Sequence, residues 1–167
     1  MDQGIAAVLG AAVGVAGTTL ASLLAGRNQA AAEQAHWRRQ SRRDAYAAFI
    51  EASEHVHDHA EQAHRFLDQD APDVGAAETH IAQARGYVDE LDRKNSLVLL
   101  EGPHEVADAA QEINNCVEAW VDALEAWSRC LTEGLDIEGA KEAASTARDE
   151  GLAAAEYFLE HAHKALA

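Results

Sequence analysis

Proline is the feature that most constrains the fold of this chain, because it occurs only twice in 167 residues, at Pro72 and Pro103. A proline removes a backbone hydrogen-bond donor and ends or kinks a helix. The segments between the prolines are free of this interruption, and they are rich in alanine, the strongest helix former. We therefore expect long helices and an all-α fold.

Apolar residues recur every three or four positions in four segments, which predicts amphipathic helices separated by turns at Asp68–Pro72, Gly102–Pro103 and Glu133–Gly134. Asp70 is the expected cap of the second helix. The first apolar stripe is Tyr46, Phe49, Ser53, Val56, Ala60, Ala63 and Leu67, the third includes Trp120, Leu124 and Trp127, and the fourth runs from Ile137 through Gly151 and Phe158 to His161. Short turns between such helices favour an antiparallel four-helix up-down bundle with narrow, coiled-coil-like seams. Trp120 and Trp127 are expected to fill its core, and an exposed aromatic docking face is the alternative.

An uncharged stretch precedes the bundle. Gly4–Gly26 is 23 residues long, or about 34 Å as a helix, which is enough to cross a bilayer. Only Met1, Asp2 and Gln3 come before it, whereas a cleaved signal peptide begins with a basic region. The sequence predicts an uncleaved transmembrane anchor over residues 1–26, continuing directly into the first helix of the bundle.

Arginines predict the orientation of this span. Five follow it closely, at Arg27, Arg38, Arg39, Arg42 and Arg43. Because cytoplasmic flanks of membrane helices are enriched in Lys and Arg, we expect a single-pass plasma-membrane protein with its N-terminus outside. Residues 27–45 then form a basic juxtamembrane helix, in which Arg38, Arg39, Arg42 and Arg43 are expected to contact lipid, the acidic body of the chain or an acidic partner.

The remainder, residues 46–167, is strongly acidic. It holds 8 Lys and Arg against 26 Asp and Glu, a formal charge of about −18. Phosphate backbones repel such a surface, so nucleic acid is not an expected partner. The sequence predicts an acidic cytoplasmic helical bundle.

Small residues occupy one face of the expected span. Gly10, Gly14, Gly17, Thr18 and Ala21 lie on this face, and larger residues such as Leu9 and Val13 lie opposite. A GxxxG spacing lets two helix backbones approach closely in lipid. We expect the span to self-associate; the alternatives are an Ala/Gly-rich anchor in which the GxxxG spacing arises by chance, and packing against another membrane protein.

Chemical motifs are sparse. His55 and His59 lie one helical turn apart and form a weak metal candidate, but they would need further ligands and are expected to face solvent. Cys116 and Cys130 are too far apart along one helix for a disulfide and are expected to be packing residues. There is no HExxH, GxSxG or glycine-rich phosphate loop, so neither an enzyme nor a bound cofactor or metal is expected.

Residues 37–46 read WRRQSRRDAY and follow an Ala/Gly-rich span. In this WRRxxRRxAY pattern the chain resembles small uncharacterised single-pass membrane proteins of Streptomyces and related actinobacteria, over residues 4–52. This resemblance implies a membrane location. In architecture, a hydrophobic helix before a four-helix bundle is similar to the HeLo-like and Bell membrane-permeabilising domains of immune effectors.

Two functions follow as the main hypotheses, with a metal-dependent activity on the histidine-rich first helix as a third. The first is a non-enzymatic, membrane-anchored interaction or scaffold module that contacts the lipid bilayer, a second copy of itself and a protein partner. The second is a membrane-permeabilising effector, HeLo/Bell-like or holin-like, in which Gly10, Gly14 and Gly17 pack helices into a pore or lesion.

Overall fold

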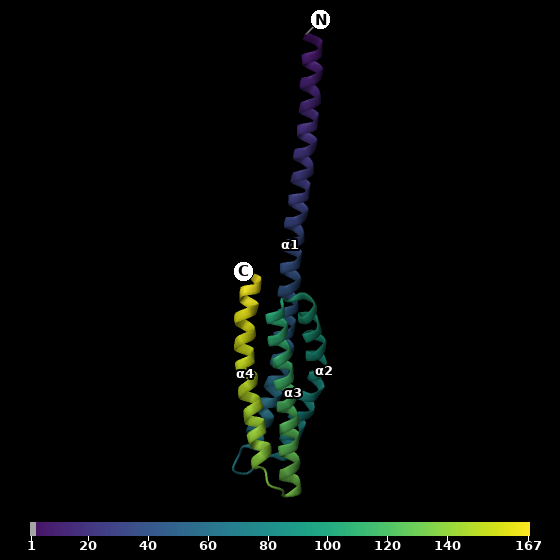
Figure 1. The fold of residues 1–167 in the computed structure, drawn as a ribbon. Helices are drawn as coiled ribbons and strands as arrows, with labels where there is room; N and C mark the ends of the chain where they lie inside the picture. The colour runs from purple at the N-terminus through teal and green to yellow at the C-terminus, as the bar shows by residue number, and fades with distance from the viewer. Residues whose placement is uncertain (1–2) are drawn as a thin grey trace. The chain divides into compact units, whose positions relative to one another are not determined.

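The computed structural model describes the backbone of residues 3–167 and the side chains of residues 33–167, and every regular element in this part of the chain is a helix. Four helices follow one another: α1 (Gln3–Leu67), α2 (Val74–Glu101), α3 (His104–Glu133) and α4 (Glu138–Leu166) (Figure 1). The prediction of an all-α fold is confirmed.

The chain divides into two compact units, Met1–Gln40 and Ser41–Ala167. The second unit contains the bundle and the last residues of the expected juxtamembrane segment 27–45. The expected span, Gly4–Gly26, lies outside the residues whose side chains are described. Among the described residues, no helical stretch combines the length and the apolar character that crossing a bilayer requires.

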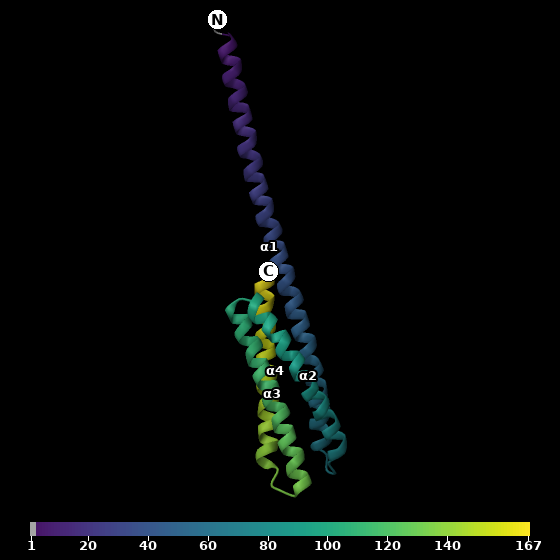
Figure 2. The same cartoon turned by 90° about the vertical axis from the view of Figure 1, so that its right-hand side faces the viewer.

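Consecutive helices of the Ser41–Ala167 unit run in opposite directions. The α1–α2 and α3–α4 turns lie at one end of this unit, and the α2–α3 turn lies at the other end with the C-terminus (Figures 1 and 2). The short connections leave neighbouring helices side by side. The described residues therefore form the up-down helical bundle that the apolar stripes predicted.

The helices end at the turns that the sequence predicted, but the predicted cap of α2 is wrong. The side chain of Asp73, not Asp70, caps α2 by accepting a hydrogen bond from the Ala76 backbone N–H at 3.0 Å. Asp73 directly precedes the first helical residue, so its carboxylate can reach an unpaired N–H of the first turn, whereas Asp70 lies before Pro72 in the loop. Gly134 ends α3 with φ of 69°, a left-handed conformation that glycine adopts without steric cost.

The core combines alanines with a few large side chains. Trp120 and Trp127 are only 2% and 1% exposed, so they fill the core and do not form an exposed aromatic face. Small residues from the other helices share this core, among them Ala60, Ala84 and Ala144, all fully buried. Alanine buries little surface but allows helix axes to approach closely, which is why so alanine-rich a chain still packs a continuous core.

The predicted stripes follow the buried faces of the helices, but several of their members are only half-buried, among them Ser53, Ile137, Gly151 and His161. Ser53 is only half-buried and lines a cavity described below. On α4 the stripe ends at Ala162, which is buried, and not at His161, which is half-buried and has its ring centroid 3.9 Å from that of Tyr157. A helix with 3.6 residues per turn drifts away from a strict 3.5-residue repeat, and the last turn of α4 has drifted by one position.

Buried amides align α2 with α3. Asn95 donates to Gln111 Oε1 at 3.0 Å, and Asn114 donates to Asp92 Oδ1 at 2.8 Å. Sliding one helix along the other would separate both pairs and leave polar groups unpaired in the core, which is costly. These contacts favour one register of the two helices, as buried asparagines do in coiled coils.

Candidate functional site

A cavity of about 210 Å³ lies between α1, α3 and α4. Its lining is mainly apolar, and the aromatic part comes from Phe49 on α1, Trp120 on α3 and Phe158 on α4. Phe49 and Phe158 pack with their ring centroids 5.2 Å apart. Concave sites with apolar walls and a few polar groups are typical of small-molecule binding sites, which makes this cavity the candidate functional site.

Small residues on α4 create this space. Ala147, Gly151 and Ala155 line the cavity at successive turns of the helix. A Cβ atom built on Gly151 would lie 3.5 Å from the Cβ of Cys116, so α4 approaches α3 closely here. Because these α4 side chains are so short, they leave volume unfilled on the side that faces α1.

Polar groups reach the cavity from α1 and α4. Glu54 and His57 come from α1, and Arg148 comes from α4. The His57 ring lies against Trp120, with their centroids 5.3 Å apart. An apolar chamber with a few polar groups at its border suits a ligand that has an apolar body and one polar or charged end.

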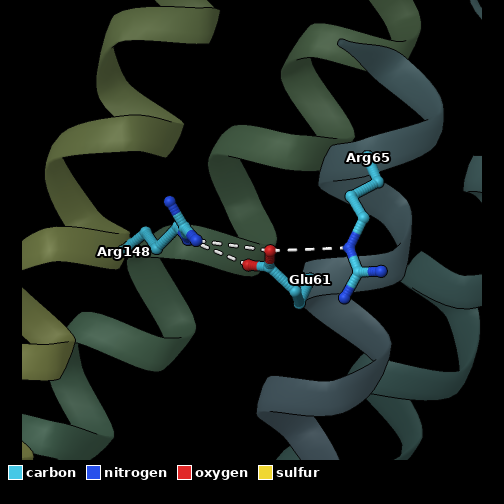
Figure 3. Close-up of polar contacts among 3 residues, drawn as sticks. All are labelled: Glu61, Arg65 and Arg148. Atoms are coloured by element: carbon cyan, nitrogen blue, oxygen red, sulfur yellow. Dashed lines mark hydrogen bonds and ion pairs between the residues drawn. The ribbon is translucent and has the colours of Figure 1, made fainter. Parts of the chain in front are cut away.

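The Arg148 guanidinium already has a counter-ion. It donates from Nε to Glu61 Oε2 at 2.9 Å and from its terminal nitrogen to Glu61 Oε1 at 3.3 Å (Figure 3). Arg65 lies on the other side of the same carboxylate, with its Nε 3.6 Å from Oε1. This two-point pairing orients the guanidinium and gives it a carboxylate partner, which it shares with Arg65.

The Cys116 thiol is part of the cavity lining. Burial raises the pKa of this thiol above its ordinary value, and the nearby carboxylates of Glu112 and Glu150 raise it further. The group therefore stays a neutral thiol at neutral pH and is a poor nucleophile, since the thiolate is the reactive form. Cys116 and Cys130 are both free, as the sequence predicted.

A histidine lies beside the tryptophans of the core. The His64 ring meets Trp127 edge-on at 5.3 Å, and its Nδ1 is buried without a hydrogen-bond partner among the described residues. Burial is the largest cause that lowers the pKa of His64 below its ordinary value. Arg148 and Lys141 lower this pKa further, whereas Glu61 and Asp68 oppose them.

We expect acid to destabilise the fold through His64. Because the pKa is lower in the folded state, the unfolded chain binds more protons below the ordinary histidine pKa of about 6.5. Neutral His64 thus contributes fully to the free energy of unfolding above that pH, and this contribution is lost as the pH falls toward the folded-state pKa. Urea unfolding of wild type and His64→Gln should show a stability difference that narrows between pH 7.5 and pH 5. The exposed His163→Gln is the control, and a difference that stays constant with pH would contradict the lowered pKa.

The two histidines of the predicted metal pair share one aromatic neighbour. His55 and His59 both lie against the ring of Tyr87, at centroid distances of 5.2 and 5.6 Å. His59 is half-buried and lies near His80 of α2, with their Nδ1 atoms 3.3 Å apart, so it does not face solvent as expected. The described residues contain no group of three or more ligand side chains placed to hold a metal ion. Sequence reasoning missed His80 because its helix is joined to α1 only through a turn, and no spacing rule links the two positions.

The four arginines of the expected juxtamembrane segment lie in different surroundings. Arg42 is half-buried and donates from Nε to the backbone oxygen of Glu101 at 2.7 Å, so it satisfies a carbonyl at the end of α2. Arg38, Arg39 and Arg43 are exposed. The glycine-face residues Gly10, Gly14, Gly17, Thr18 and Ala21 lie outside the residues with described side chains.

Comparison of the chain with protein-family models, curated proteins and solved structures finds no match.

Proposed function

We propose that this chain is a non-enzymatic, membrane-anchored binding module. The observation that carries the proposal is the uncharged stretch Gly4–Gly26, which is long enough to cross a bilayer and is joined to a compact helical bundle. The bundle adds a concave apolar site between α1, α3 and α4. An anchored bundle with such a site fits a protein that holds a ligand or partner at the membrane surface.

Charge supports the proposed orientation. Arg38, Arg39 and Arg43 are exposed beyond the span, and the bundle that follows is strongly acidic. By the positive-inside rule the bundle lies on the cytoplasmic side of the plasma membrane. Its negative surface selects partners that are neutral or basic and disfavours nucleic acid.

The span is proposed to associate with a second copy of itself. Its small-residue face places Gly10 and Gly14 one helical turn apart, where backbones can approach closely in lipid. Such pairing would bring two acidic bundles together at the membrane. The anchor and the self-association are separate statements, so they require separate readouts.

Membrane fractionation and cross-linking test both statements. After an alkaline carbonate wash, the full chain is expected to stay in the membrane pellet, because a spanning helix resists extraction. Cross-linked dimers should fall about tenfold in Gly14→Leu, the change produced by about 1.4 kcal/mol of lost packing. Val13→Leu, which enlarges the opposite face, is the matched control and should leave dimers intact.

Each failure has a distinct meaning. Recovery of the chain in the carbonate supernatant would refute the anchor. Dimers that persist equally in Gly14→Leu would refute assembly through the glycine face while leaving the anchor in place. Depolarisation of cells on induced expression, lost in Gly14→Leu, would instead favour the membrane-permeabilising alternative.

A further inference from the structure

We propose that the cavity between α1, α3 and α4 binds a small organic cation, an aromatic or alicyclic body that carries an amine or ammonium group. The proposal deepens the role of binding module and depends on it for its biological setting. The cavity size, the aromatic lining and the distribution of charge at the edge each constrain the ligand.

Cavity size sets the body of the ligand. A cavity of about 150 Å³ lined by aliphatic and aromatic side chains is enough to hold benzene. The cavity here is about 210 Å³, so it has room for one ring and a short substituent. Leu152 and Leu159 of α4 line it and are 46% and 54% exposed, which places an apolar lip where a ligand enters from solvent.

The aromatic lining suits a cationic group. Phe49, Trp120 and Phe158 line the space, and they belong to three different helices. The face of an aromatic ring attracts a cation, and the attraction is strongest for tryptophan and for cations partly removed from water. An ammonium group near Trp120 would be stabilised by this contact, whereas a carboxylate would be repelled by the same ring face.

The charges at the cavity edge decide the sign of the ligand. Arg148 is held by two hydrogen bonds to Glu61, so its guanidinium already has a carboxylate partner. Glu54 also lines the cavity, but it has no ion-pair partner among the described residues. The carboxylate of Glu54 is therefore the group in the cavity lining with which an ammonium group would pair.

The charged groups around the cavity are also mainly negative. Glu112 and Glu150 lie close enough to Cys116, which lines the cavity, to raise the pKa of its thiol beyond the effect of burial. The whole of residues 46–167 carries a formal charge of about −18. Such a field concentrates cations and repels anions before any contact is made.

The test uses three probes of matched shape. They are 3-phenylpropylamine, 3-phenylpropanol and 3-phenylpropionate, which are cationic, neutral and anionic at pH 7. Each is titrated by calorimetry into the full chain in phosphatidylcholine nanodiscs, with empty nanodiscs as the blank. We expect the amine to bind with a dissociation constant on the order of 0.1 mM, reasonable for so few atoms. It should bind about tenfold tighter than the alcohol, and the propionate should bind weakest.

Two variants locate the site and its counter-ion. In Glu54→Gln the amine should lose its tenfold advantage while the alcohol binds as before, and because Glu54 is exposed the change should not disturb folding. Glu51→Gln removes the same charge from the same helix at an exposed position outside the cavity lining, and it should change amine binding less than about twofold. Ala155→Leu should weaken all three probes by filling the space.

Three results would overturn the proposal. Equal affinity for the three probes would indicate an apolar cavity without charge selection. An amine preference unchanged in Glu54→Gln would remove the assigned counter-ion. Absence of binding by every probe at about 1 mM, roughly ten times the expected dissociation constant, would remove the site itself. Fractionation reports separately on the membrane anchor, so failure of the anchor cannot be mistaken for failure of the cation site.

Discussion

Replacement of Trp120 by alanine is expected to lower the free energy of unfolding by about 3–5 kcal/mol. Trp120 is 2% exposed, and its ring lies 5.3 Å from the His57 ring and 6.4 Å from the His64 ring. Removing the indole leaves a hole beside the existing cavity, and the helices around it can close only part of the space. Domains are stable by only about 5–15 kcal/mol, so this one change threatens the whole fold.

Denaturation of the full chain, followed by the helical circular dichroism signal, measures this loss. Trp37→Ala is the matched control, because Trp37 is 66% exposed and its removal should change stability by about 0.5 kcal/mol or less. The indole Nε1 of Trp120 has no hydrogen-bond partner among the described residues. Trp120→Phe should therefore cost clearly less than Trp120→Ala, since only packing is lost. A Trp120→Ala variant as stable as Trp37→Ala would contradict the buried position of this ring.

Phe158→Ala is the second large change, with an expected cost of about 3–5 kcal/mol. Across α4, which is described in full, Phe158 is the one large side chain that is fully buried, and the other buried residues are alanines. Its ring packs at 5.2 Å on Phe49 and edge-on at 5.9 Å on Tyr46. These contacts connect the C-terminal half of α4 to α1.

We expect Phe158→Ala to loosen the C-terminal half of α4 before it unfolds the whole bundle. Because alanine buries little surface, α4 without Phe158 has few contacts that hold its second half against α1. Hydrogen exchange is therefore expected to accelerate in residues 152–166 more than in α3, where Trp120 and Trp127 remain. Tyr157→Ala, a neighbouring ring that is 49% exposed, should cost about 1 kcal/mol and leave exchange in α4 nearly unchanged. Uniform acceleration along all helices would show instead that the bundle opens only as a whole.

The sequence by itself determined the helices and their buried faces. Proline and glycine mark the ends of helices through backbone geometry, and apolar residues at three- and four-residue spacing identify the face that leaves water. These are local properties, so Val56, Trp120, Leu124 and Trp127 could be assigned to the core without knowledge of any neighbouring helix. The sequence predicted Asp70 as the cap of α2, but the cap is Asp73. Several acidic residues lie in this short loop, and only the backbone geometry selects which of them caps the helix.

The tertiary structure alone decided which residues of different helices meet. Glu61 pairs with Arg148, His59 lies against His80, and Arg42 satisfies the carbonyl of Glu101. A helical period indicates which face of a helix is buried, but not how far that helix is rotated or shifted against its neighbours. The cavity arises in the same way, because the small residues of α4 become an empty space only when α1 and α3 are positioned around them. Periodicity within one helix thus determined the core, whereas the packing of several helices determined the candidate site.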